Sequence, residues 1–93
     1  MKIEHQEGEK NGYFYYAPDG KKLAVMAYVW AGADKLIIDH TDVDATLKGQ
    51  GIGNELLASL VSFVRKENVK VIPLCPFAKA TFQKNIDWQD VLS

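Results

Sequence analysis

Three features of this 93-residue chain could take part in chemistry: a glycine-rich stretch, His40 and Cys75. The stretch is KGQGIG (48–53), in which Lys48 precedes Gly49, Gly51 and Gly53. Glycines let a ligand approach the backbone closely and permit unusual φ values. An apolar run with helical spacing follows, so we expect the stretch to begin a helix, whose unpaired N–H groups can bind phosphate.

Three phosphate-binding patterns compete for this stretch. A P-loop needs its lysine after the glycines, whereas Lys48 precedes them. A dinucleotide pattern begun at Gly49 would need glycine where Asn54 stands, and the stretch lies in the middle of the chain. The third pattern, [QRK]-x-x-G-x-[GA], is met by Lys48, Gly51 and Gly53. Taken alone, the pattern is equally compatible with a tight turn before a helix.

His40 and Cys75 are the candidate reactive side chains. Histidine is the natural general base at neutral pH. Cys75 precedes Pro76 and a short helical pattern, and a thiol at a helix N-terminus is favoured as thiolate. Both residues also have a structural interpretation. Unpaired cysteines are commonly buried, and the alternation predicts that His40 shares a strand face with Leu36 and Ile38.

The elements that position these residues follow from apolar spacing and turn residues. Before the glycines, the pattern predicts an antiparallel meander with short turns. Its strands are expected at GYFYY (12–16), KLAVMAYVW (22–30) and KLIIDHTDV (35–43), with KIEHQ (2–6) as a weaker edge strand. Strand 22–30 is apolar on both faces, which predicts a central strand covered on both sides.

After the glycines, the apolar spacing changes to a helical period over about residues 51–67, and Asn68 is expected to end that helix. KVIPLC (70–75) predicts a short buried strand. FAKATFQKN (77–85) predicts a second helix, with Pro76 at its first position and IDWQDVLS as a closing tail. The order ββββ-α-β-α, with a right-handed crossover, predicts an α+β fold with a mixed sheet and a parallel strand pair. The length predicts one domain over residues 1–93.

Composition narrows the classes of function. The net charge is −1 and the pI about 6.1, which argues against a general electrostatic grip on nucleic acid or a membrane. The polar start and the lack of a long apolar run, together with a single cysteine, predict a cytoplasmic protein. Asp39, Asp42 and Asp44 do not fit a calcium loop, and two histidines with one cysteine argue against a zinc site, so no metal is expected.

The glycine pattern, in its place between a meander and a long helix, resembles the pyrophosphate loop of the GNAT acyltransferases. A second family pattern, N-x-x-A-x-x-x-Y, is similar to CPFAKATF (75–82), where Ala78 and Phe82 match and Cys75 replaces asparagine. The resemblance covers roughly residues 22–86. IDHTDVD, GQGIG and PLCPFAKATF look most like the minimal single-domain branch, which lacks the extra helices that usually form an acceptor pocket.

The resemblance implies a GNAT-like fold in which two parallel strands splay apart and the pantetheine arm of CoA lies in the gap. It implies acetyl-CoA as co-substrate and a small amine, or an amine of a peptide or protein, as acceptor. His40 and Cys75 would both point into the gap, His40 as general base. The residues implied in CoA binding are Thr41 and Val43 through their backbone, Lys48, Gly49, Gln50, Gly51, Ile52, Gly53 and Phe82.

Phe82 departs from the family, because GNAT enzymes often have tyrosine there to protonate the leaving CoA thiolate, and phenylalanine has no proton to give. Either Cys75 or solvent supplies the proton, or Cys75 accepts the acyl group, or turnover is poor. Two functions follow. One is an acetyl-CoA-dependent N-acetyltransferase of minimal size; the alternative is a module that binds CoA or acyl-CoA with little or no turnover.

Overall fold

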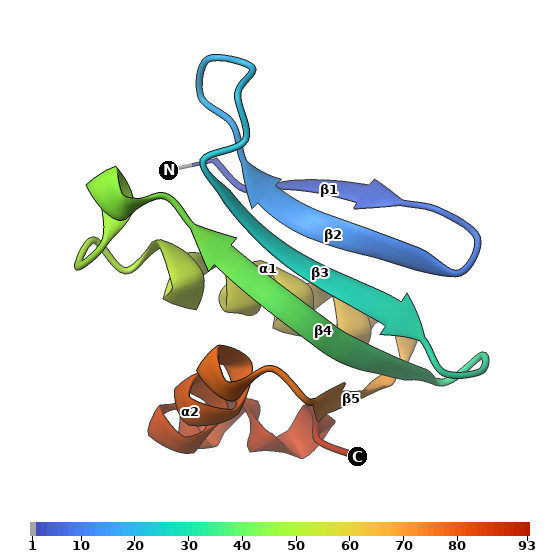
Figure 1. Cartoon of the computed structure of the whole chain (residues 1–93). Helices are drawn as coiled ribbons and strands as arrows, with labels where there is room; N and C mark the ends of the chain where they lie inside the picture. Colours follow the sequence, from blue (N-terminus) through green and yellow to red (C-terminus); the bar gives the residue numbers. More distant parts are fainter. Residues whose placement is uncertain (1) are drawn as a thin grey trace.

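The computed structural model describes residues 2–93 and confirms the expected order of elements (Figure 1). Five strands form one sheet in the order β1-β2-β3-β4-β5. The neighbouring strands from β1 to β4 are antiparallel, and β5 is parallel to β4. The strands are β1 (Glu4–Glu7), β2 (Asn11–Tyr16), β3 (Ala24–Trp30), β4 (Lys35–Val43) and β5 (Lys70–Pro73).

Two α-helices follow the meander: α1 (Ile52–Glu67), which joins β4 to β5, and α2 (Pro76–Lys84), which follows β5. Asn68 ends α1 in the left-handed conformation, and its N–H donates to carbonyls of the last turn, as expected for a helix stop. The described residues also include two 3-10 helices. They are η1 (Ala45–Leu47), before the glycine loop, and η2 (Ile86–Val91), within the expected tail.

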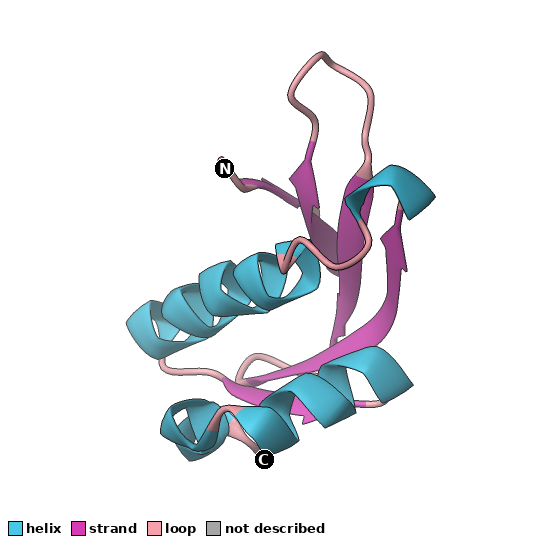
Figure 2. Ribbon diagram, turned by 90° about the vertical axis from the view of Figure 1, so that its left-hand side faces the viewer, coloured by secondary structure: helices cyan, strands magenta, loops and turns pink. Residues whose placement is uncertain are grey.

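The hydrophobic core lies between one face of the sheet and α1, and α2 runs along the β5 edge (Figure 2). Ala24, Met26 and Tyr28 of β3 are buried on this face, whereas Val25 on the other face is only partly buried. The prediction that strand 22–30 is covered on both sides is therefore wrong. Among residues 2–93, α1 packs on the core face and α2 lies at the β5 edge, so neither α-helix covers the outer face (Figure 2).

The pairing of β3 with β4 contains a β-bulge. Ala27 lies opposite His40. The next residue of β3, Tyr28, lies opposite Ile38, so Asp39 is an extra residue without a partner on β3. One extra residue reverses the side-chain alternation for the rest of the strand, because side chains alternate with a period of two.

The bulge changes which face each later residue of β4 occupies. Thr41 lies opposite the buried Met26 and so faces the core side of the sheet. His40 lies on the outer face instead, and its side chain is 57% exposed. The prediction that His40 shares a face with Leu36 and Ile38 is wrong, because the alternation that carries those two residues inward is interrupted at the bulge.

The strands β4 and β5 separate just beyond this point. Their last pair is Ile38 with Pro73. The N–H groups of Leu74 and Cys75 both donate to the Ile38 carbonyl at 3.2 Å, after which the two chains part. The strand expected over 70–75 therefore ends at Pro73, whose missing N–H cannot extend the ladder. A gap opens between β4 and the start of α2.

The C-terminal residues close the outer edge of β5. The Ser93 N–H donates to the Val71 carbonyl at 2.9 Å, and Arg65 of α1 forms an ion pair of 2.6 Å with Asp90 of η2. These contacts hold η2 against α1 and β5. In the part of the chain that the structure describes, no helix has the length and apolar character needed to cross a membrane.

Candidate active site

A cavity of about 540 Å³ lies where the end of β4, the glycine loop and α2 meet. Its volume is in the range of small-molecule sites. Three parts of the chain contribute to its wall, each adjacent to the gap between β4 and β5. The lining residues are Thr41, Asp42, Val43, Leu47, Lys48, Gly49, Gly51, Ile52, Gly53, Asn54, Phe77, Thr81 and Lys84.

The glycine loop has a backbone that only glycine adopts easily. Gly49 and Gly51 have φ values of 82° and 75°, and a Cβ built on either would meet nothing within 4 Å. Their lack of side chains is therefore not required by packing against the rest of the protein. It is required by the left-handed backbone, and it leaves open space beside the loop.

The exposed donors of the loop lie at the start of α1. The first N–H of this region with a helical acceptor is that of Glu55, which donates to the Gly51 carbonyl at 3.1 Å. The N–H groups of Ile52, Gly53 and Asn54 precede it and have no acceptor within the helix. Together with the positive end of the helix dipole, they form a site suited to phosphate.

Gln50 differs from its neighbours in the loop. Its N–H donates to the Leu47 carbonyl at 3.2 Å, and its side chain donates to the Thr46 carbonyl. Gln50 is not among the residues that line the cavity. The sequence-based expectation that its backbone holds phosphate is therefore not supported, because the residue maintains the turn instead.

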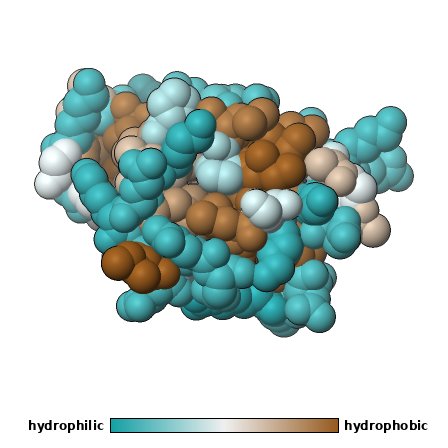
Figure 3. All heavy atoms as spheres, turned by 90° about the horizontal axis from the view of Figure 1, so that it is seen from below, coloured by the Kyte–Doolittle hydropathy of each residue, from teal (hydrophilic) through white to brown (hydrophobic). Residues whose placement is uncertain are grey.

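Gly53 lies directly beside an aromatic ring, which leaves no space for a side chain at this position. A Cβ at Gly53 would overlap the ring of Phe77, the second residue of α2. Phe77 is 41% exposed and lines the cavity. On the side of the molecule that carries α2, apolar side chains gather between hydrophilic ones (Figure 3). The large hydrophobic residues exposed among the described ones are Leu74, Phe77 and Ile86.

Cys75 lies behind the cavity wall at the N-cap of α2 and is 6% exposed. Its thiol donates to the Thr41 hydroxyl across a Sγ–Oγ1 distance of 3.5 Å. Thr41 lines the cavity, whereas Cys75 does not. The expected meeting of Cys75 with the strand before the loop is therefore present, but the partner on that strand is Thr41.

The surroundings of Cys75 favour the thiolate. Burial alone would raise the pKa of the thiol, but hydrogen bonding outweighs burial and the net pKa lies below its ordinary value. The contributing groups are the Thr41 hydroxyl, the N–H groups of Ala78 and Phe77 at the start of α2, and the Thr41 N–H. Donors at a helix N-terminus stabilise an anion in this way.

His40 lies on the opposite face of β4 from Thr41. Its Nδ1 is 3.8 Å from an oxygen of Asp39, and its Nε2 is 3.6 Å from an oxygen of Asp42. The imidazole is thus exposed beside two carboxylates at the point where β4 leaves β5. The structure does not bring His40 and Cys75 to the same side of the strand.

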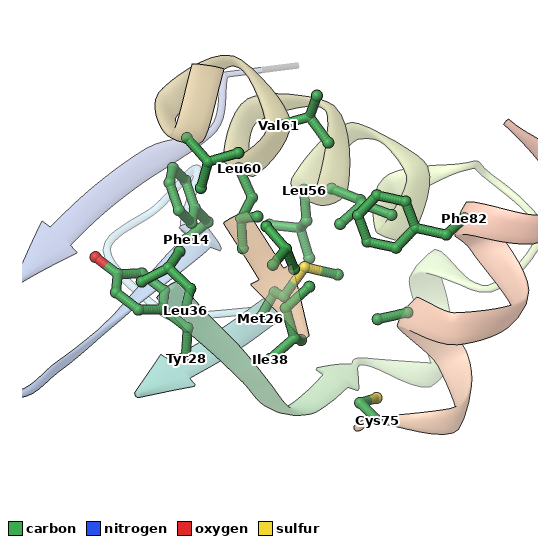
Figure 4. Close-up of a cluster of buried hydrophobic side chains, with 14 of the residues drawn as sticks. Phe14, Met26, Tyr28, Leu36, Ile38, Leu56, Leu60, Val61, Cys75 and Phe82 are labelled. Carbon is green, nitrogen blue, oxygen red and sulfur yellow. The ribbon is translucent and has the colours of Figure 1, made fainter. Parts of the chain in front are cut away.

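Phe82 is a core residue. Its side chain is 2% exposed, and its ring points toward Leu56 of α1 (Figure 4). It does not line the cavity, so the CoA contact expected for it is not supported. Phenylalanine fits this apolar setting, where a tyrosine hydroxyl would need a hydrogen-bond partner.

Sequence reasoning missed the wall that α2 provides. Phe77, Thr81 and Lys84 all line the cavity and are spaced i, i+4, i+7, so they occupy one helix face. That spacing is visible in the sequence and groups the three residues on one face, but it does not say what that face meets. Asn54 was also missed; its side chain accepts a hydrogen bond from Asn85 beyond α2. Across residues 2–93, no group of three or more His, Cys, Asp or Glu could hold a metal ion.

Comparison with known proteins gives consistent matches. Residues 12–91 match the family described as GCN5-related N-acetyl-transferase. The solution structure of a GCN5-like candidate N-acetyltransferase from Staphylococcus aureus is similar over 97% of this chain and 87% of its own, with 36% identity and a TM-score of 0.73. Nourseothricin acetyltransferase shares the fold over 67% of this chain and 38% of its own, with 20% identity and a TM-score of 0.54. No curated protein matches the chain.

Proposed function

Because this chain belongs to the GCN5-related N-acetyl-transferase family, we propose that it is a minimal acetyl-CoA-dependent N-acetyltransferase that acts on an amine. The GNAT-like fold agrees with this assignment. The observation that carries the proposal is the continuous cavity that joins the start of α1 to Thr41 at the gap between β4 and β5. Its single buried thiol is compatible with work in a reducing cytoplasm.

The loop end of the cavity would bind the pyrophosphate of CoA. The N–H groups of Ile52, Gly53 and Asn54 would donate to its oxygens, and Lys48 would add positive charge. The pantetheine arm would run along the free edge of β4, where the backbone at Thr41 and Val43 has lost its partner strand. The thioester would then lie at the gap, beyond Thr41.

One proton transfer would take place on each face of β4: protonation of the CoA sulfur on the inner face and deprotonation of the amine on the outer face. Thr41 and Cys75 lie on the inner side of the gap, where the CoA sulfur would lie. His40 lies on the outer side, where an amine could approach without crossing the core. His40 would take the proton from the amine as a general base, and the nearby Asp39 and Asp42 would favour a cationic acceptor.

A binding experiment tests this proposal. CoA and acetyl-CoA should raise the melting temperature in a concentration-dependent way, because a ligand of the native state stabilises it by mass action. ATP and NAD at matched concentrations should raise it much less. Equal stabilisation by all four would reduce the site to a general anion site and contradict the proposal. Turnover would then be measured with acetyl-CoA and a broad panel of amines and peptides.

The alternative function is a module that binds CoA or acyl-CoA with little or no turnover. The buried Phe82 favours it, because the position where the family often has a tyrosine acid carries no proton and does not face the cavity. Stabilisation by CoA without turnover of any amine in the panel would support this alternative. Acceptor-dependent release of free CoA thiol would exclude it.

A further inference from the structure

Thr41 separates the cavity from the only thiol of the chain. Its side chain lines the cavity and accepts the hydrogen bond from Cys75, whose Sγ lies 3.5 Å from Oγ1. Cys75 itself is 6% exposed and is not part of the wall. The bulge at Asp39 creates this arrangement, since without the extra residue His40 would face Cys75 and Thr41 would point outward.

We propose that the Thr41 hydroxyl passes a proton from Cys75 to the departing CoA sulfur, so that Cys75 acts through Thr41 and does not carry the acyl group. This inference rests on the proposed acetyltransferase function. It makes Thr41 a further catalytic residue, through its side chain as well as its backbone.

The proton transfers balance as follows. When the amine has attacked the thioester carbonyl, the C–S bond breaks and its electron pair goes to sulfur. Thr41 donates its hydroxyl proton to that sulfur and takes the thiol proton of Cys75 in its place. Cys75 is left as thiolate and regains a proton from water after the products leave. The amine loses its own proton to His40 on the other face of β4.

Two properties of the site suit this relay. Hydrogen bonding to Cys75 holds its pKa below that of an ordinary thiol, such as the CoA thiol being formed, so the proton passes toward the weaker acid. The groups that lower the pKa of Cys75 also stabilise the thiolate it becomes. The other hydroxyl of the cavity wall that could compete, on Thr81, is 2.8 Å from the Phe77 carbonyl to which it donates.

The burial of Cys75 argues against direct acylation. To attack a thioester in the cavity, Sγ would have to pass the Thr41 side chain that covers it. An acetyl group on Sγ would also have to fit behind the wall, where Cys75 is almost fully buried. Direct attack therefore needs a movement of α2 that the relay does not need.

The pH dependence of the Cys75 thiolate absorbance tests the contact without requiring activity or access of a reagent to the thiol. Cys75 is the only cysteine, so the rise in ultraviolet absorbance as the thiolate forms, measured against Cys75→Ser, gives a pH midpoint that reports the pKa of this thiol. Thr41→Val, which keeps the shape and removes the hydroxyl, should move the midpoint to higher pH. Thr41→Ser, which restores the hydroxyl, should return it close to wild type. Thr81→Val, which removes a hydroxyl of the same cavity that does not contact Cys75, should leave it unchanged.

Two further measurements complete the test. With an accepted amine, Thr41→Val should lower kcat by about 10²-fold while CoA affinity is kept, and Thr41→Ser should recover most of the rate. Incubation with acetyl-CoA alone should add no acetyl mass to the intact protein. An acetyl increment that hydroxylamine removes, or an unchanged midpoint of the thiolate titration in Thr41→Val, would overturn the relay. Failure of CoA to bind at all would instead overturn the proposed function, while the titration midpoints would still show whether Thr41 controls the thiol.

Discussion

The two ends of the cavity are built in opposite ways. At the loop end, glycines leave open space, and the groups proposed to bind phosphate are backbone N–H donors at the start of α1. At the other end, which we call the thiol end, the functional groups are packed side chains: Thr41 lines the cavity and Cys75 is buried behind it. In the proposed function, the first end holds a charged ligand with groups that need no side-chain rearrangement. In the proposed relay, the second end depends on one hydroxyl, that of Thr41.

This difference assigns different sensitivities to the two ends. A backbone site is lost when a side chain fills its space, and it is nearly indifferent to which polar side chains surround it. A side-chain site is lost when one functional group is removed, even if its shape is kept. Substitutions at the loop should therefore change CoA affinity, and those at the gap should change rate.

The largest expected effect is at Gly51. Gly51→Val should abolish stabilisation by CoA, because a branched side chain would occupy the space beside the N–H donors at the start of α1. The melting temperature with and without CoA measures this. The left-handed φ of 75° adds a backbone strain of about 1–2 kcal/mol, so the variant should also be less stable without ligand.

Gly20 provides a matched control for the strain. It has a φ of 86°, a Cβ there meets nothing within 4 Å, and it lies in the turn between β2 and β3, outside the cavity. Gly20→Val should show a similar loss of stability and keep the full response to CoA. If both variants keep the response, the glycines of the loop serve only the turn.

The same contrast explains what the sequence could predict. The loop end is encoded by consecutive residues from Lys48 to Gly53, so its motif and its place before a helix were readable. The thiol end depends on one extra residue, Asp39, that is visible only when β3 and β4 are paired. Strict alternation over residues 35–43 places His40 on the face of Leu36 and Ile38, whereas the bulge puts Thr41 on that face.

The sequence also could not predict which residues of α2 are buried and which line the cavity. The spacing of CPFAKATF predicted a helix after β5, and the helix is present. The spacing does not say which side of that helix faces α1. Phe82 packs against the core and Phe77 lines the cavity, because α2 lies beside α1 with the Phe77 ring over Gly53. That choice is made by long-range packing, which local patterns do not contain.

His40→Gln sharpens the comparison at the gap. The variant should lower kcat by about 10²-fold, as expected for loss of a general base, and leave stabilisation by CoA unchanged. Steady-state rates with an accepted amine, together with the melting temperature with CoA, separate the two effects. An unchanged kcat would show that solvent takes the amine proton and that His40 has no part in the chemistry.

Gly53→Ala tests where the two ends meet. The family pattern accepts alanine at this position, but here a Cβ would overlap the Phe77 ring and push it from its place at the cavity wall. We expect CoA affinity to fall by about tenfold, or 1.4 kcal/mol, measured by calorimetry. Adding Phe77→Ala to Gly53→Ala should restore most of the affinity. If the double variant stays as weak as Gly53→Ala, the new Cβ itself blocks the ligand.

The smallest expected effect is at Lys48, the cation of the loop end. Lys48 is an exposed side chain at the cavity rim, so its attraction for phosphate is screened by water and salt. Lys48→Ala should weaken CoA binding by about 1 kcal/mol, or roughly fivefold, and the loss should shrink as salt is raised. Lys79→Ala makes the same change in net charge on α2 outside the cavity and should have little effect. Equal effects of the two variants would mean that only overall charge matters, whereas a much larger loss in Lys48→Ala would show that the loop end depends on a side chain and not chiefly on its backbone.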